Sequence, residues 1–134
     1  MLTNSLTITF RSQKLCNDLI LFLKDRNHRI IDQVVFGNNT QKSTTFDLSF
    51  PNTLYIEIEN RGHNNFLIHL EKIKLSGLSL PDQIIDQICQ FRQTGTDVTT
   101  ISRSWNQLGT VSIDFFASDF IQYHLLYGNK ITKT

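Results

Sequence analysis

Glu57 and Glu59 are the nearest approach in this sequence to a catalytic pair of carboxylates. They stand two residues apart in an alternating segment, so on a strand they would share one face at a separation of about 7 Å. Carboxylates at roughly that separation can hydrolyse a glycosidic bond. An acidic row on an outward strand face also discourages unwanted edge pairing. We adopt the second interpretation and predict that the protein is not an enzyme and has no catalytic residues.

Catalytic motifs of known mechanism are absent from the sequence. It contains no GxSxG, HExxH, P-loop or GxGxxG pattern. The two cysteines, Cys16 and Cys89, have neither a CxxC spacing nor a histidine at ligand spacing, and no export signal precedes them. One disulfide would be allowed, but we predict two reduced thiols.

Two sets of oxygen-bearing side chains could bind Ca²⁺, which takes carboxylate and amide oxygens as ligands. They are Asp25, Asn27 and Asp32, and Glu57, Glu59 and Asn60. Neither set has the spacing of an EF-hand loop, and the four histidines form no pair at metal-ligand spacing. We therefore predict no metal site and no cofactor.

Trp105 is the only tryptophan and lies in polar surroundings. An exposed tryptophan can stack on a sugar ring or anchor a protein interface, whereas a buried one could cover the open end of a core. The sequence leaves these three roles open and favours the cover. The candidate binding residues are Trp105, its neighbours Arg103 and Asn106, and the amphipathic Tyr55.

Alternation of apolar and polar residues at period two dominates the chain and predicts strands. The predicted strands are 6–11, 17–24, 30–36, 46–50, 54–59, 66–75, 111–115 and 120–127, the last two forming a hairpin. The segment 17–24 is apolar on both faces, which predicts a central strand covered on each side. Ile73 and Leu75 are out of phase with Ile68 and Leu70, which predicts a β-bulge near residues 71 and 72.

One segment, about 82–93, is predicted to be helical. Pro81 and Asp82 suit a first turn, and Ile84, Ile85, Ile88 and Phe91 form one apolar stripe. The polar segment 92–104 that follows is predicted to be a long loop. Many short strands with one helix exclude a parallel sheet, so we predict an antiparallel β-sandwich of jelly-roll type.

The composition is that of one folded domain over residues 1–134. Apolar residues are 40% and charged residues 19% of the chain, and the formal net charge is +1. That balance argues against a dedicated binder of nucleic acid or of a membrane surface. No apolar stretch reaches the roughly 18 residues of a membrane-spanning helix.

Residues 54–80 resemble the strand–loop–strand of xylan-binding-type carbohydrate-binding modules, and the pattern extends over residues 6–80. The match comprises Asn60, then Gly62, then a second strand ending at Gly77. The resemblance implies a small β-sandwich with a calcium-binding loop and a sugar site. Arg61 and Asn65 stand where that pattern has acidic residues.

Two functions remain in view. The first is a non-catalytic structural or attachment protein, a small virion component such as a phage capsid decoration or tail accessory. It would be made in the cytoplasm without a signal peptide and would contact other protein subunits of a multimeric assembly. This hypothesis rests on analogy with other sandwiches. The alternative is a carbohydrate-binding module that binds a glycan through Trp105 and nearby Tyr, Asn and Glu residues.

Overall fold

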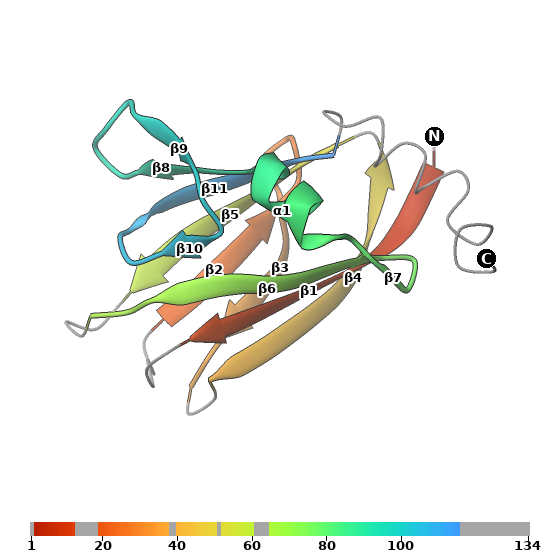
Figure 1. The fold of residues 1–134 in the computed structure, drawn as a ribbon, viewed down its shortest axis with the longest axis horizontal. Helices are drawn as coiled ribbons and strands as arrows, with labels where there is room; N and C mark the ends of the chain where they lie inside the picture. The colour runs from red at the N-terminus through yellow and green to blue at the C-terminus, as the bar shows by residue number, and fades with distance from the viewer. Residues whose placement is uncertain (1, 13–18, 38–39, 51, 61–64, 116–134) are drawn as a thin grey trace.

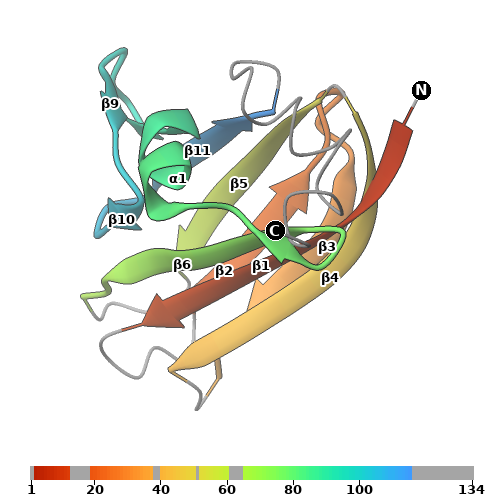
Figure 2. The same ribbon diagram turned by 45° about the vertical axis from the view of Figure 1, so that its right-hand side comes forward.

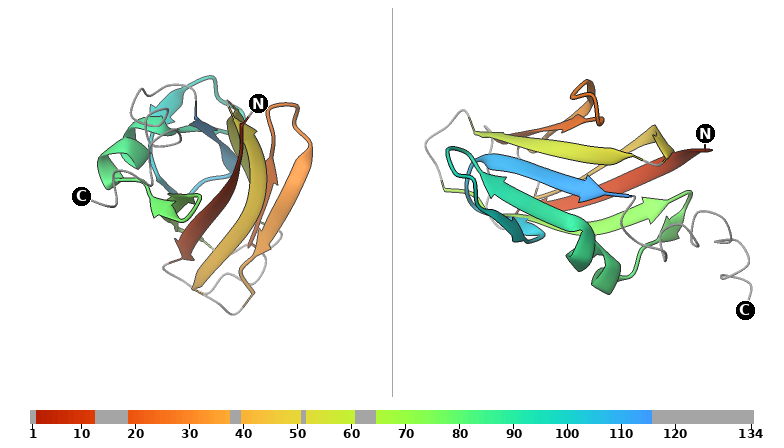
Figure 3. Two further views of the ribbon diagram at one scale, coloured as in Figure 1. Left: turned by 90° about the vertical axis from the view of Figure 1, so that its right-hand side faces the viewer. Right: turned by 90° about the horizontal axis from the view of Figure 1, so that it is seen from above.

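The computed structural model describes residues 2–12, 19–37, 40–50, 52–60 and 65–115. They form two antiparallel sheets packed face to face (Figure 1), and the two layers curl around a shared interior (Figure 3). The first sheet has the order β10-β6-β1-β4, with β7 paired to β6, and the second has the order β3-β2-β5-β11-β8-β9. The predicted fold class, an antiparallel sandwich with one short helix, is confirmed.

The element bounds place most strands where the alternation predicts them. In the first sheet they are β1 Leu2–Ser12, β4 Gln41–Phe50, β6 Ile68–Leu75, β7 Leu78–Ser79 and β10 Ser104–Trp105. In the second they are β2 Leu19–Lys24, β3 Ile30–Val35, β5 Thr53–Asn60, β8 Cys89–Gln93, β9 Thr99–Ile101 and β11 Gly109–Asp114. The helix α1 is Asp82–Ile88. The predicted return strand at 120–127 lies outside the described residues.

The strand β2 shows how alternation builds the core. Leu19, Leu21 and Leu23 are fully buried between the sheets, because alternate residues of a strand point to the same side. The intervening Ile20 and Phe22 are only half-buried on the outer face. The strand is central, between β3 and β5, as predicted, but the predicted full cover of its outer face is wrong.

The predicted β-bulge is confirmed in β6. Thr9 pairs with Lys72 and Phe10 pairs with Leu70, so Glu71 is the extra residue on β6. The inserted residue shifts the phase of the strand by one. Both Leu70 and Ile73 can therefore point into the core, where each is fully buried.

On each side of the sandwich, one connection joins the edge strand of one sheet to the edge strand of the other. The link from β3 to β4 passes from the edge of one sheet to the edge of the other, and the link from β9 to β10 does the same at the opposite side. At the first crossing the hydroxyl of Thr44 donates to the carboxylate of Asp32. Thr44 is buried, so this hydrogen bond ties the two sheets at their common edge.

Asn52 joins three turns at one end of the sandwich. Its side-chain amide donates to the carbonyl of Ser49 at 3.0 Å, and its side-chain oxygen accepts from the amide of Thr53 at 2.8 Å and of Arg26 at 3.3 Å. Its own carbonyl accepts from the amide of Phe115 at 3.1 Å. The turn between β2 and β3 is thereby held against the end of β5 and β11.

The helix is shorter than predicted, because residues 89–93 form β8 rather than its last turns. Ile85 and Ile88 are buried as the apolar stripe predicts. Cys89 and Phe91 instead pair with Ile113 and with Val111 of β11, and these backbone hydrogen bonds replace helical ones. The predicted loop 92–104 is wrong for the same reason, since β9 and the first residue of β10 lie within it.

The helix α1 lies beside β6 of one sheet and beside β8, β9 and β11 of the other (Figure 2). It therefore covers the opening between the sheets on that side. No helix among residues 2–115 that the structure describes is long and apolar enough to span a membrane.

Cys89 gives the fold a pH dependence that can be measured. Its thiol is free and buried, and burial raises the pKa of the thiol from 9.0 to about 12. Cys16 lies outside the described residues. Between pH 9 and about 12 the unfolded chain loses a proton that the folded chain keeps, so stability falls as pH rises, by at most about 1.4 kcal/mol per pH unit.

We expect urea unfolding of the wild type to show this alkaline loss, and Cys89→Ala to show a shallower loss over the same pH window. The difference between the two profiles isolates the contribution of the Cys89 thiol. Parallel profiles would show that the Cys89 thiol is not the responsible group.

Candidate functional site

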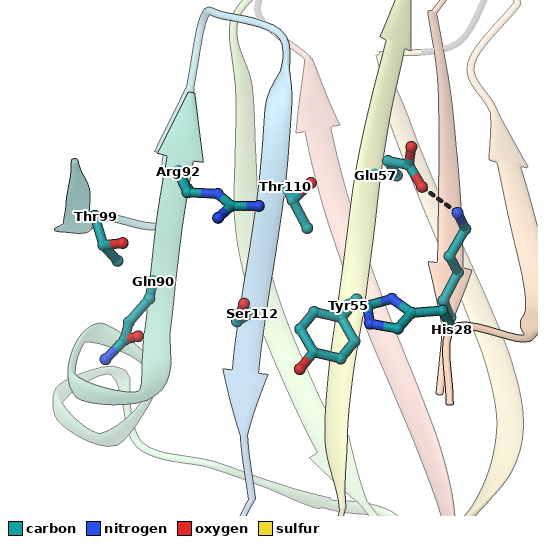
Figure 4. Close-up of a pocket in the computed structure, with 9 residues that line it drawn as sticks. His28, Tyr55, Glu57, Gln90, Arg92, Thr99, Thr110 and Ser112 are labelled. Carbon is teal, nitrogen blue, oxygen red and sulfur yellow. Dashed lines mark hydrogen bonds and ion pairs between the residues drawn. The ribbon is translucent and has the colours of Figure 1, made fainter. Parts of the chain in front are cut away.

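The outer face of the six-stranded sheet is hollowed into a cleft of about 430 Å³ (Figure 4). Strands β2, β5, β11, β8 and β9 and the turn between β2 and β3 contribute its walls and floor. The cleft is open to solvent along the sheet, and the side chains that line it are polar or charged, with an aromatic ring among them. This shape and lining suit the binding of a hydrophilic chain.

The strand register explains why these side chains meet. Thr110 of β11 pairs with Arg92 of β8 on one side and with Glu57 of β5 on the other. Adjacent strands lie about 4.8 Å apart, so these three side chains form a row across the sheet. Figure 4 shows the Arg92 side chain lying across toward Thr110.

A second row lies two residues along the same strands. Ser112 pairs with Gln90 of β8 and with Tyr55 of β5, and Tyr55 pairs in turn with Lys24 of β2. Because the period of a strand is two, this row faces the same side as the first. The residue between the two rows on β11, Val111, is fully buried on the opposite face.

Close packing of two strands sets the position of Arg92. Gly109, at the start of β11, is buried against β8, and a Cβ there would lie 2.4 Å from the carbonyl oxygen of Arg92 and 2.6 Å from the ring of Phe91. Glycine is therefore required for this approach.

An aromatic pair stands at one end of the cleft. The rings of His28 and Tyr55 are stacked with centroids 4.6 Å apart and an interplanar angle of 22°. His28 has a φ of +61°, a conformation uncommon outside glycine. Asp25 holds that turn, since its carboxylate accepts from the amides of Asn27 at 2.9 Å and Arg29 at 3.0 Å.

The charges in the cleft are unequally satisfied. Glu57 forms an ion pair with Lys24. The side chain of Arg92 has no hydrogen-bond or ion-pair partner in the described part of the chain, although its guanidinium carries five donors. Glu59, the other member of the acidic row, does not line this cleft, so the structure does not assemble the two glutamates into one site.

The cleft continues past Arg92 into a neighbouring hollow of about 440 Å³. The two spaces share Glu57, Arg92 and Thr110, and the second extends over residues 93–97 at the turn between β8 and β9. Together they form one groove from the aromatic pair to that turn, which we call the sheet groove. Its elongated shape suits an extended ligand.

Unused hydrogen-bonding groups line the sheet groove. Within the described residues, the side chains of Gln90, Thr110 and Ser112 make no hydrogen bond to the protein. Such groups are free to exchange water for the hydroxyls of a ligand.

A hollow of about 320 Å³ on the outer face of the other sheet differs from the sheet groove, because several of its polar side chains are bonded to other side chains. There Thr7 bonds Thr45 at 2.9 Å, and Glu71 accepts from Gln41 at 2.7 Å and from Arg11 at 3.0 Å. The hydrogen bond from Gln41, followed by that from Arg11, lowers the pKa of the Glu71 carboxyl. These groups already satisfy one another, so they offer less to a ligand than the sheet groove does.

The predicted binding residues are not brought together. Tyr55 lines the sheet groove, whereas Trp105 lies in β10 of the other sheet. Trp105 is 1% exposed and donates from Nε1 to the carbonyl of Ser102 at 3.0 Å, so it offers no face for stacking. It has the core-covering role, and its proposed place in a glycan or protein interface is wrong. Asn106 is exposed but does not line the groove.

Arg103 is a structural residue rather than a surface contact. Its Nε donates to the carbonyl of Leu70 at 2.8 Å, and its Nη2 donates to that of Glu71 at 2.7 Å. Its Nη1 reaches Asp82 and Asp86 of α1 at 3.2 and 3.3 Å. The side chain of Arg103 is only 13% exposed. It therefore connects the bulge of β6 to the helix.

Sequence reasoning missed His28, Gln90, Arg92, Thr110 and Ser112. Alternation around Val111 and Ile113 marks the last two as outward-facing, but it does not say which strands lie beside them. Because residues 82–93 were predicted to be helical, Gln90 and Arg92 were not expected to lie beside β11.

Comparison with models of known families and with curated proteins gave no match to this chain. Two solved structures are similar. One, described as "vCBM60 in complex with galactobiose", has a TM-score of 0.60 and 11% identity, with 83% of this chain and 98% of that chain covered. The other is a selenomethionine form of vCBM60, with a TM-score of 0.55 and 10% identity, covering 83% and 90%.

At this identity the likeness is one of fold. The chain has the β-sandwich fold of these carbohydrate-binding modules, and the resemblance predicted from residues 6–80 is confirmed at that level. The second structure is described as belonging to calcium-dependent carbohydrate-binding modules.

The described residues do not fit a calcium site. Nowhere among them do three or more His, Cys, Asp or Glu side chains gather. Asp25 is bound to the amides of its own turn, and Asp32 is bound to Thr44 of the other sheet. Glu57 is paired with Lys24. Neither set of candidate ligands is assembled around a point, so we derive no role for calcium.

We expect Trp105→Ala to lower stability by roughly 3–5 kcal/mol, because it removes a large, fully buried side chain. Urea unfolding monitored by circular dichroism measures the loss. Asn106→Ala, at the exposed neighbouring position, is the control and should stay within about 0.5 kcal/mol of the wild type. A Trp105→Ala protein as stable as this control would contradict the buried position of the indole.

We expect Arg103→Met to cost about 3 kcal/mol, because it leaves two carbonyls of the bulge without their donor. The ion pairs to the exposed Asp82 and Asp86 should contribute less than about 1 kcal/mol. Arg92→Met removes an unpartnered arginine and is the matched control, with an expected change within about 0.5 kcal/mol. Equal losses in the two variants would refute the structural role of Arg103.

Proposed function

We propose that this protein binds a saccharide chain in the sheet groove and does not transform it. The observation that carries the proposal is an elongated, open groove with an aromatic ring at one end and unused hydrogen-bonding groups along its floor. The proposal takes up the glycan-binding alternative, with a different set of contact residues from those expected around Trp105.

The aromatic pair supports a sugar ligand. A sugar ring has an apolar face of C–H groups that can lie against an aromatic ring. Tyr55 is half-buried in the sheet and braced by His28, so the ring is fixed before a ligand arrives. A fixed ring loses little conformational entropy on binding.

The floor supports the same ligand class. Gln90, Thr110 and Ser112 present an amide and two hydroxyls in two rows, and the alternation of β11 holds the hydroxyls on one side. Sugar hydroxyls both donate and accept, as these groups do. A groove with unused partners of both kinds is suited to a hydroxyl-rich chain.

The fold adds a consistent context. The two similar structures are carbohydrate-binding modules, and one of them is described in complex with galactobiose. This supports glycan binding over the attachment-protein hypothesis. Contacts with other protein subunits and a place in a virion stay predictions. The pairing of Glu57 with Lys24 gives no support to a hydrolytic pair with Glu59.

Tyr55→Ala tests the proposal. We expect wild-type protein to bind members of a glycan array, in Ca²⁺ and in EDTA, and Tyr55→Ala to lose at least roughly tenfold in affinity by calorimetry, which corresponds to about 1.4 kcal/mol. Tyr55→Phe keeps the ring and should retain most of the binding. Thr45→Ala, on the exposed face of the other sheet, is the control.

Because removal of Tyr55 could disturb the sheet, a second variant blocks the groove instead. Ser112→Phe places a strand-compatible ring beside Tyr55 and should abolish binding with the thermal midpoint preserved. Absence of any bound glycan in the wild type, or unchanged affinity in both Tyr55→Ala and Ser112→Phe, would reject the proposal.

A further inference from the structure

We infer that the sheet groove selects saccharides that carry a carboxylate, and that Arg92 binds that carboxylate. The inference rests on the proposed function, since it names the class of saccharide for the same groove. It follows from the difference between Arg92 and the other charged residues that line the groove.

The charges along the sheet groove are unevenly paired. Lys24 is matched by its ion pair with Glu57, and the groove between the aromatic pair and Arg92 then holds one unmatched cation, Arg92. Asp97 lies at the far end of the groove from the aromatic pair, in the turn between β8 and β9, and forms no ion pair with Arg92. The central part of the groove is therefore positive where a ligand would lie.

Arg92 lies where the cleft and its extension meet. It lines both the cleft and its extension, so a chain occupying the groove would pass it. Thr110 lies beside it on β11, and Thr99 pairs with it on β9. Arg92 thus stands between two hydroxyl-bearing neighbours, at the junction of the two hollows, and its side chain runs across the sheet toward Thr110 (Figure 4).

The guanidinium of an arginine is suited to binding a carboxylate. It is planar, always charged and presents its N–H groups as a fork, which matches the two oxygens of a carboxylate. Two other arginines use this fork within the protein, Arg11 with Glu71 and Arg103 with the β6 carbonyls. Arg92 makes no such contact among the described residues, so its fork is available to a ligand.

A neutral saccharide would leave this cation without an anionic partner. A uronic acid or a sialic acid supplies one on the sugar itself, while its ring and hydroxyls still meet Tyr55, Thr110 and Ser112. The same groove therefore accommodates both kinds of contact at once. Selectivity would come from Arg92, and the bulk of the contact surface from the sheet.

The experiment uses matched ligand pairs. Oligosaccharides containing uronate or sialate residues are printed beside their carboxyl-reduced forms, in which each acid is an alcohol on the same backbone. We expect at least roughly tenfold preference for the acidic member of a bound pair at low salt, falling as ionic strength rises. Oligosaccharides with a neutral backbone that carries sulfate esters are included, so that a different anion is also tested.

Arg92→Gln should bring the acidic-to-reduced affinity ratio to about one while binding of the reduced form is retained, and Arg92→Lys should keep part of the preference. Lys74→Gln removes the same charge from the outer face of the other sheet and should leave the ratio unchanged. The thermal midpoint of each variant is measured alongside.

The outcomes separate the two proposals. Binding of neutral or reduced saccharides without preference for the acid, or a preference for sulfate, overturns the carboxylate inference and leaves the saccharide proposal standing. A preference that survives in Arg92→Gln overturns the role of Arg92. Absence of binding to every saccharide overturns the proposed function, and the inference with it.

Discussion

The guanidinium of Arg103 binds the carbonyls of Leu70 and Glu71 at the bulge of β6, and the arrangement of that side of the sandwich depends on this contact. The bulge places an extra residue in β6, which disrupts regular strand pairing at that point. Carbonyls left without a donor in a buried position are costly. Arg103 supplies the donors, and its remaining N–H groups reach α1, so one side chain joins a strand to a helix.

This contact reaches the sheet groove through the backbone. The residue before Arg103, Ser102, donates its amide to the carbonyl of Cys89 at 3.1 Å, where α1 ends and β8 begins. The strand β8 then pairs with β11, and that register sets Arg92 beside Thr110. A buried structural arginine thus helps to position an exposed arginine that is free to bind, and the two have opposite roles although they lie close in the sequence.

Much of the fold was predictable because its signals are local. Alternation gives strands and their inward faces without knowledge of their partners, and the phase change between Leu70 and Ile73 gives the bulge. The end of the helix was not predictable in this way. Ile85, Ile88 and Phe91 keep helical spacing, but pairing of Phe91 with Val111 of β11 decides the conformation, and that partner is distant in the chain.

The sequence by itself determined the class of fold and the alternating core. Only the tertiary structure decided which residues meet. It buried Trp105 in the core, turned Arg103 inward and brought Arg92 and Tyr55 to one groove. The physical reason is that side-chain direction follows from a period of two along one strand, whereas a binding surface follows from the order and register of several strands, which backbone pairing between distant segments sets.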